Sequence, residues 1–350
     1  MLTQGIKKLF PFLILVLCAF QLFGQNESNH STVYMLRAYE DDDYFNDIGM
    51  GTDKAYTSGE QLNLFYNLNH KPGFFLDKIL PKAGDSSINT YSLGLMQMMY
   101  TPDYLTTSYY VYNDYSYAGA DFAKHSLYSY NPKKKYDLQT ELVLGIMGPS
   151  SFAGTAQHWL HTVLQDTAIP NGWGNQYRNA VLANINFTIE KEIVSNKGFQ
   201  AIGRAQISAG TMFDAIELGT SIYIGKMNPY FNGFMGHFSN SYTDKCYNKI
   251  QLYIMLKAAG QYVRYSAMIQ GGMFSPQPMV KTIIVSGQSK ETVYVEKPKQ
   301  EIENFVGIAE YGPVITYKHW AASWTQTYST PVLKNVYSYI YGNMSIYYSW

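Results

Sequence analysis

The residues best suited to chemistry lie in a short stretch from Gly148 to His161. A helix that begins after Gly154 would place Gln157 and His161 four residues apart on one face. A neutral imidazole accepts a proton near physiological pH, so such a histidine can act as a general base. His158 lies three residues before His161, but two histidines without a third ligand are weak evidence for a metal site. A histidine that only makes structural hydrogen bonds is the alternative interpretation.

A second candidate segment, from Glu40 to Asp53, is strongly acidic. Clustered carboxylates repel one another unless a cation joins them, and hard oxygen ligands suit calcium. The spacing departs from the EF-hand pattern, because Phe45 stands where that loop has an oxygen ligand. A calcium site and an ordinary solvated acidic loop both remain open for this segment.

The usual motifs of soluble enzymes are absent from the sequence. It contains no Gly-x-Ser-x-Gly, no Gly-x-Gly-x-x-Gly, no Walker loop and no His-Glu-x-x-His. The 26 basic and 26 acidic residues cancel, which leaves no electrostatic argument for a nucleic-acid partner. These observations disfavour a soluble hydrolase, a nucleotide-binding protein and a nucleic-acid-binding protein.

The composition favours a membrane protein built from strands. Only 15% of the 350 residues are charged, against about 25% in soluble globular domains. Aromatic residues make up 16% of the chain, and 33 residues are tyrosine. After the N-terminus no apolar run reaches the roughly 18 residues that a transmembrane helix needs. Few charges, many tyrosines and no long apolar run are typical of a transmembrane β-barrel.

The N-terminus predicts export. Two lysines precede an apolar stretch from Leu9 to Phe23, the pattern of a secretory signal. Cleavage near Gly24 would make residues 1–24 a signal peptide and residues 25–350 the mature chain. A lipoprotein signal at Cys18 is the alternative, but bulky residues precede this cysteine where small ones are expected.

The C-terminal segment shows the clearest strand pattern. Alternate residues from Val336 to Trp350 are mostly apolar, with Ser338 as the exception, and the intervening residues are all Tyr, Asn or Ser. Successive side chains of a strand point to opposite faces, so the apolar set would meet lipid and the polar set would line a barrel interior. A strand that ends in an aromatic residue at the C-terminus also resembles the assembly signal of outer-membrane barrels.

The same alternation recurs along the chain and predicts an all-β fold. We expect an antiparallel transmembrane β-barrel of about 12 strands, in one domain, with short helical segments in the extracellular loops. The predicted strands cover residues 32–40, 59–68, 88–98, 120–130, 137–147, 178–191, 200–210, 214–225, 249–271, 302–311, 313–327 and 335–349.

Strand parity gives the side on which each loop lies. An even number of strands returns both termini to the periplasm. With the first strand rising from the periplasm, segments 41–58, 99–119 and 148–177 fall on the extracellular side. These are the segments that hold the candidate histidine and the acidic cluster. Segment 272–300 is interpreted only as an extracellular hairpin around residues 285–288.

Several blocks of sequence, in the same order, resemble the lipid A 3′-O-deacylase family of LpxR-type outer-membrane barrels. The blocks are Asp42–Phe45, Thr52–Gly59, Tyr100–Asp103, Asp114–Gly119, Leu144–Pro149 and Pro170–Gln176. They cover residues 42–176, and the strand pattern continues the similarity to Trp350. Ordered blocks are far more specific than any one of them alone.

The resemblance implies an outer-membrane enzyme that removes the 3′-linked acyloxyacyl group from lipid A with calcium as cofactor. It places the family's catalytic histidine at His161, its glutamine at Gln157 and its hydroxyl residue at Thr57. The aspartate of the family's Asn-Asp pair falls on Asp43, with Asp42 in the position of the asparagine.

Three positions depart from the family pattern. Asp42 replaces an asparagine, Ser116 replaces a proline, and Asp166 stands in the region where some members have a glutamate. Residues Asn46 and Asp47 offer a second register for the Asn-Asp pair. These departures bear on calcium geometry and activity more than on the fold.

The predicted catalytic set is therefore His161, Gln157, Thr57, Asp42 and Asp43, and the predicted calcium ligands are Asp43 and Asp166. The hypothesis is that His161 activates water, that calcium acts as a Lewis acid at the ester carbonyl, and that Gln157 or Thr57 adds a hydrogen bond. The expected partner is lipid A in the lipopolysaccharide of the outer leaflet. Two alternatives remain open: an inactive relative that binds lipid A, and a passive pore or receptor barrel.

Overall fold

Twelve antiparallel strands form one closed barrel in the computed structural model, which describes residues 34–46, 53–68, 73–164, 168–232, 250–286 and 289–350. The strand order is β1-β14-β13-β12-β9-β8-β7-β6-β5-β4-β3-β2, and β2 pairs back onto β1. These strands are β1 (Tyr34–Asp42), β2 (Ala55–Asn67), β3 (Ile88–Thr101), β4 (Ala118–Asn131), β5 (Tyr136–Met147), β6 (Ala180–Asn196), β7 (Phe199–Gly210), β8 (Phe213–Lys226), β9 (Gln251–Ser266), β12 (Phe305–Tyr317), β13 (Trp320–Ser329) and β14 (Tyr339–Ser349).

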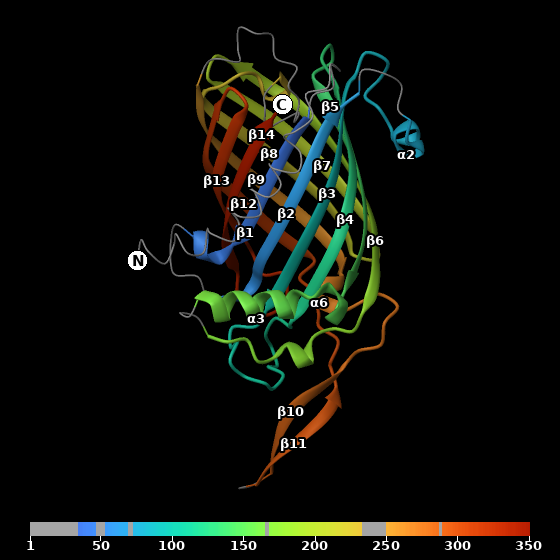
Figure 1. The fold of residues 1–350 in the computed structure, drawn as a ribbon, viewed down its shortest axis with the longest axis vertical. Coiled ribbons are helices and arrows are strands. Elements are labelled where there is room, and N and C mark those ends of the chain that lie inside the picture. Colours follow the sequence, from blue (N-terminus) through green and yellow to red (C-terminus); the bar gives the residue numbers. More distant parts are fainter. Residues whose placement is uncertain (1–33, 47–52, 69–72, 165–167, 233–249, 287–288) are drawn as a thin grey trace.

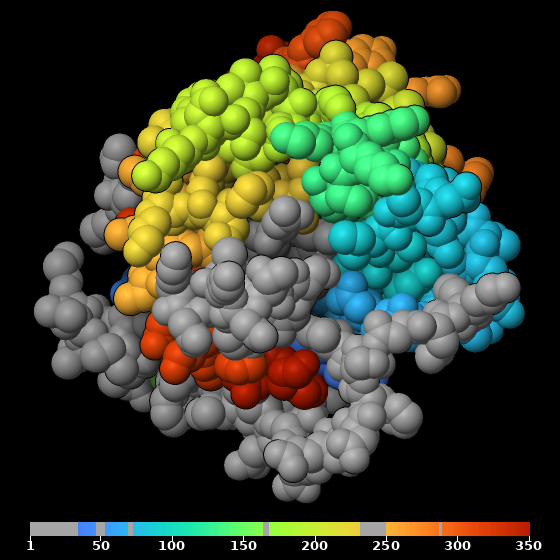
Figure 2. Space-filling view, turned by 90° about the horizontal axis from the view of Figure 1, so that it is seen from above, coloured from blue at the N-terminus to red at the C-terminus, as the bar shows by residue number. Residues whose placement is uncertain are grey.

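The barrel confirms the predicted fold class and the predicted number of strands. Nearest neighbours in sequence pair around the whole circumference, apart from the step from β9 to β12 and the closure of β14 onto β1. Figure 2 looks onto one end of the barrel, where the colours follow one another around the rim in sequence order. The predicted signal peptide at residues 1–24 lies outside the described residues.

Alternation of side chains explains why these segments form a barrel wall. On β3, Leu93 and Leu95 are exposed on the outer face, whereas Ser92 points inward and is buried. On β14 the last four members of the predicted inward set are buried. These four are Asn343, Ser345, Tyr347 and Ser349. The outer face of the wall therefore carries the apolar side chains that a lipid-facing surface needs.

Several predicted strand boundaries differ from the observed ones, and two of these differences have a clear structural cause. The predicted break between strands 302–311 and 313–327 fell at Gly312, but Gly312 lies inside β12, and the turn to β13 comes at Lys318, where φ is 52°. Gly312 is needed for close approach, because a Cβ there would overlap the backbone of Trp324 on β13. The predicted strand 249–271 also ends too late, since β9 stops at Ser266 and the short helix α6 (Ala267–Gln270) follows.

The long loops gather at one end of the barrel. Figure 1 shows α3 (Ala153–Leu164), α6 and a separate hairpin of β10 (Met279–Ser286) and β11 (Ser289–Glu296) at this end. The hairpin confirms the one predicted around residues 285–288, although its tip at 287–288 lies outside the described residues. The described parts of segments 41–58, 99–119 and 148–177 share this end, as parity predicted.

Helices contribute little to the wall. The helix α2 (Phe75–Ile79) lies at the end opposite α3, where no helix was predicted. Three-residue 3₁₀ helices η1 (Asp43–Phe45), η2 (Pro149–Ser151), η3 (Trp173–Asn175) and η4 (Tyr230–Asn232) complete the described elements. No helix among the described residues is long and apolar enough to cross a membrane.

Candidate active site on the outer wall of the barrel

Helix α3 lies against the outside of the barrel, across the ends of β3 and β4 (Figure 1). The chain reaches this position through Gly148, whose φ is 90° and whose missing Cβ avoids the backbone of the segment at Arg178. Gly119 on β4 permits the close approach, because a Cβ there would overlap the Cβ of Ala153 at the start of α3. Gln97 on the outer face of β3 donates to the carbonyl of Ser151 at 2.9 Å and fixes the preceding turn.

The face of α3 that meets the barrel carries the predicted pair. Ala153, Gln157 and His161 recur every four residues, and all three are buried. The helix and the shared face of Gln157 and His161 are therefore as predicted. Both side chains line a cavity between α3 and the barrel wall.

His161 is held at both ring nitrogens. Its Nδ1 lies 2.7 Å from the carbonyl oxygen of Ala168, and its Nε2 lies 3.2 Å from Oδ2 of Asp53. A carbonyl oxygen only accepts, so Nδ1 carries a proton, and Nε2 is the nitrogen that can take up a second one. The Asp53 carboxylate faces Nε2 and would stabilise the imidazolium that forms. The side chain of His161 is therefore oriented as a base whose protonated form has a charge partner.

Asp53 is itself held by two of the predicted residues. Its backbone N–H donates to Oδ2 of Asp43 at 2.5 Å, and its carbonyl accepts from Oγ1 of Thr101. Thr57 Oγ1 lies 2.5 Å from Oγ1 of Thr101. Asp53 and Ala55 both have positive φ, at 48° and 60°, so the surrounding contacts hold a strained loop in place. Asp43 and Thr57 thus act on His161 by positioning Asp53.

Sequence reasoning gave no role to Asp53. It was counted among the acidic residues of its loop, and its place in the block Thr52–Gly59 was the available signal. Its contact with His161 joins residues that are more than one hundred positions apart, which no local pattern predicts.

Gln157 presents an unpaired donor. Its Oε1 accepts from Nε1 of Trp173 at 2.8 Å, which fixes the orientation of the amide. Its Nε2 is buried and has no hydrogen-bond partner among the described residues. Trp173 packs in turn on the ring of Tyr117, at 5.0 Å between centroids. A rigid amide whose N–H groups lack a partner is suited to bind an oxygen atom of a ligand.

The carboxylates near η1 form a negative cluster. Asp42 caps η1 and accepts from the backbone N–H of Tyr44 at 2.6 Å. Electrostatic repulsion acts between Asp42 and its neighbours Asp43, Asp53 and Glu40. Such oxygen donors have the chemistry that calcium prefers, and a cation would relieve their repulsion.

The described carboxylates do not by themselves complete a metal site. Within residues that the structure describes, no three His, Cys, Asp or Glu side chains are grouped as metal ligands. Asp166, the second predicted ligand, and Asp47, from the alternative register, lie outside those residues. The carboxylate oxygens around Asp43 are therefore of the type that a hard cation prefers. The other ligands of a calcium site remain a prediction.

The cavity between α3 and the wall has a volume of about 390 Å³. Its polar side combines the predicted residues with polar side chains of β1, β2 and β3, and its apolar side comes from η1, β3 and α3. The lining residues are Tyr39, Glu40, Asp42, Tyr44, Phe45, Asp53, Thr57, Ser58, Glu60, Gln61, Gln97, Met99, Ala156, Gln157, Trp159, Leu160 and His161.

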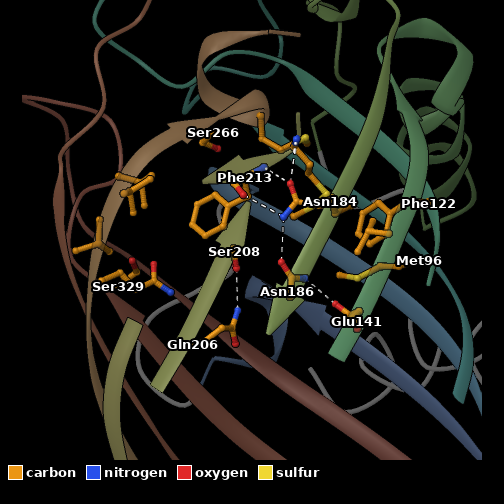
Figure 3. Close-up of a pocket in the computed structure, with 18 of the residues that line it drawn as sticks. Met96, Phe122, Glu141, Asn184, Asn186, Gln206, Ser208, Phe213, Ser266 and Ser329 are labelled. Atoms are coloured by element: carbon orange, nitrogen blue, oxygen red, sulfur yellow. Dashed lines mark hydrogen bonds between the residues drawn. The ribbon is translucent and has the colours of Figure 1, made fainter. Parts of the chain in front are cut away.

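A second cavity, of about 290 Å³, lies inside the barrel (Figure 3). Its polar side chains are joined to one another: Asn184 donates to Asn186 at 3.0 Å, and Asn186 donates to Glu141 at 2.9 Å. Met96 and Phe122 contribute apolar surface to the same cavity. None of the predicted site residues lines it. The chemistry indicated by the sequence therefore belongs to the outside of the wall.

The model of the family described as outer membrane protein LpxR matches residues 9–350. The chain belongs to the LpxR family. This assignment makes it an outer-membrane barrel, in agreement with the lipid-facing surface described above. A search of the curated proteins found no match.

A solved structure with a TM-score above 0.5 shares the barrel architecture of this chain. LpxR from Salmonella typhimurium is similar with a TM-score of 0.65 and 16% identity, over 91% of this chain and 99% of that one. The beta domain of the Bordetella autotransporter BrkA is similar at a TM-score of 0.40 and 9% identity, over 91% of this chain and 98% of that one. At these identities the likeness to Salmonella LpxR concerns the fold of the LpxR-family barrel.

Proposed function

We propose that the protein is an outer-membrane esterase that removes the 3′-linked acyloxyacyl group from lipid A. The observation that carries the proposal is the pair of nitrogen groups on one buried face of α3. His161 offers a base backed by Asp53, and one turn away Gln157 offers an unpaired amide donor in the same cavity. A base and an oxyanion donor are the two groups that ester hydrolysis requires.

The position of the cavity supports a lipid substrate. Leu95 is 65% exposed on the outer face of β3, one outward position along the strand from Gln97, which lines the cavity. The site therefore opens at the margin of the lipid-facing surface, at the end of the barrel that parity assigns to the outer leaflet. Lipid A is the lipid of that leaflet for which the family resemblance argues.

The residues act in a defined order in the proposed reaction. Nε2 of His161 takes a proton from water as the water oxygen adds to the ester carbonyl. The N–H groups of Gln157 donate to the carbonyl oxygen as it becomes negative. Asp53 stabilises the imidazolium, which then returns the proton to the sugar oxygen as the bond from carbon to that oxygen breaks. The products are a carboxylic acid and a free hydroxyl group.

Calcium dependence is part of the proposal. Asp43 and Asp166 are the proposed ligands, with Asp42 close by. When bound, calcium would neutralise the carboxylate cluster and polarise a carbonyl oxygen as a Lewis acid. The described residues support the calcium proposal because they offer carboxylate oxygens, which are the donors that calcium prefers.

Mass spectrometry of lipid A tests the function directly. The refolded full-length barrel is incubated with lipid A in calcium and, in parallel, with a calcium chelator. Loss of a 3′-linked acyloxyacyl unit only with calcium is expected. Unchanged lipid A from a barrel shown to be folded would overturn the esterase and favour an inactive lipid A-binding relative. Equal cleavage in chelator would overturn the calcium requirement alone.

A further inference from the structure

Helix α3 has three distinct stripes rather than two. One stripe is buried against the barrel and consists of Ala153, Gln157 and His161. A second is exposed and polar, with Thr155, His158 and Thr162. The third is apolar and includes Trp159, which is 56% exposed, and Val163, which is 52% exposed. At 3.6 residues per turn, the polar and apolar stripes lie on opposite sides of the buried one.

An ordinary surface helix has one buried apolar stripe and a polar remainder. On α3 the buried stripe is occupied by site residues, and a separate apolar stripe remains exposed. Phe152, immediately before the helix, extends this stripe and is also exposed. A helix with exposed polar and apolar stripes side by side is suited to the boundary between water and a bilayer. Tryptophan is favoured at that boundary.

The neighbouring wall supports a lipid environment for the apolar stripe. The turn before α3 is bonded to Gln97, and the next outward residue on β3 is the exposed Leu95. Leu144 on β5 is exposed on the same outer surface. The apolar stripe of α3 is therefore adjacent to the lipid-facing surface of the barrel, and acyl chains of the outer leaflet are its expected partner.

The inner edge of the apolar stripe is also a wall of the cavity. Trp159 and Leu160 line the cavity together with Met99 of β3 and Phe45 of η1. Trp159 thus borders both the exposed surface and the space that contains His161. A chain that passes from the bilayer to the site along this edge would meet apolar side chains throughout.

We propose that α3 lies in the outer leaflet with its apolar stripe among acyl chains, and that Trp159 guides an acyl chain of the substrate from the bilayer into the site. The placement of α3 in the leaflet is independent of catalysis. The guiding role of Trp159 rests on the proposed esterase function.

Spin labels on adjacent residues test the placement. In full-length protein carrying Cys18→Ser and Cys246→Ser, single variants Val163→Cys and Thr162→Cys are labelled and reconstituted in phospholipid vesicles. Relaxation by oxygen, which dissolves in lipid, is compared with relaxation by a water-soluble nickel chelate. We expect the label at position 163 to respond more to oxygen and the label at position 162 to respond more to nickel. A stronger response to nickel at both positions would overturn the placement.

Kinetics of Trp159 variants test the guiding role. With lipid A in vesicles, Trp159→Ala is expected to raise KM about tenfold with a smaller change in kcat, because apolar contact with the acyl chain is lost. Trp159→Phe, which keeps an aromatic ring, should restore most of the affinity. An unchanged KM in Trp159→Ala, or a loss confined to kcat, would overturn the role.

The two experiments separate the possible failures. If the unaltered protein does not cleave lipid A, the proposed function fails, and the spin labels still decide whether α3 lies in the bilayer. If cleavage occurs while both labels face water, the function stands and the placement of α3 is wrong.

Discussion

The outer-wall site and the cavity inside the barrel are built from opposite faces of the same strand. On β3, Met96 and Met98 point inward to the lumen cavity, whereas Gln97 and Met99 point outward to the site. Both spaces combine apolar and polar lining residues. A strand whose side chains alternate can therefore supply two unrelated environments a few ångströms apart.

The two spaces differ in how their polar groups are satisfied. Among described residues that line the lumen cavity, none has a buried side-chain polar atom without a hydrogen-bond partner. Lys124 and Glu141 form an ion pair of 3.4 Å there. At the outer site, Gln157 Nε2 and one carboxylate oxygen of Glu60 are buried without such a partner. Closed networks hold strands together, whereas unpaired groups are available to a ligand.

Replacement of His161 should cause the largest loss of activity among the variants considered. His161→Ala removes the proposed base, and the rate of lipid A cleavage should fall about 10²–10⁴-fold. Release of the acyloxyacyl product is followed by mass spectrometry. His158→Ala, on the polar stripe of the same helix, is the matched control and should keep its activity. If the His161→Ala protein were as active as the His158→Ala protein, His161 would not be the base in the reaction.

Replacement of Gln157 should cause the second-largest loss of activity. Gln157→Glu keeps an oxygen that accepts from Trp173 but removes the unpaired N–H groups, so kcat should fall about 10²–10³-fold. Trp173→Phe is the complementary variant, because it removes the hydrogen bond to Oε1 of Gln157 and leaves the N–H groups in place. The decrease in kcat should therefore be smaller for Trp173→Phe than for Gln157→Glu. If Gln157→Glu lost no more activity than Trp173→Phe, the unpaired N–H groups of Gln157 would have no part in the reaction.

Local periodicity explains what the sequence could predict. Strands repeat every two residues and helices every 3.6, so the wall and the shared face of Gln157 and His161 follow from short patterns. The ion pair of Asp53 with His161 depends instead on a loop, a strand and a helix that are distant in sequence. Gly312 was misread because glycine marks turns and also close contacts between strands, and only the packing distinguishes the two.

The lumen should respond to substitution in stability rather than in activity. Glu141→Gln breaks the ion pair with Lys124, which is expected to lower the free energy of unfolding by about 1–3 kcal/mol. Cleavage of lipid A by the folded protein should be unchanged. Unfolding in urea and cleavage are measured on the same preparation. A double variant, Lys124→Met with Glu141→Leu, leaves no unpaired charge and should recover part of the stability. A strong loss of activity in folded Glu141→Gln would contradict the separation of the two spaces.

Lys297 limits the rule that an unpaired buried group indicates a ligand. It follows β11, is 1% exposed, and its Nζ has no hydrogen-bond partner among the described residues. The Tyr177 ring, 3.3 Å from Nζ at its centroid, favours the charged amine, but burial dominates and lowers the pKa of Lys297 well below its usual 10.5. Neither cavity contains this residue. We therefore interpret its burial as a cost to stability.

This interpretation predicts a dependence of stability on pH. Between the lowered pKa of folded Lys297 and 10.5, the unfolded chain binds the extra proton, so Lys297 contributes a stability that rises with pH. Lys297→Met should remove that contribution and raise the free energy of unfolding at pH 7 by roughly 1 kcal/mol, with a smaller gain near pH 10. Urea unfolding of both proteins at the two pH values measures the difference. If Lys297→Met were less stable than the unaltered protein at pH 7, the amine of Lys297 would make a favourable contact there. The rule that an unpaired buried group indicates a ligand would then apply to Lys297 as well.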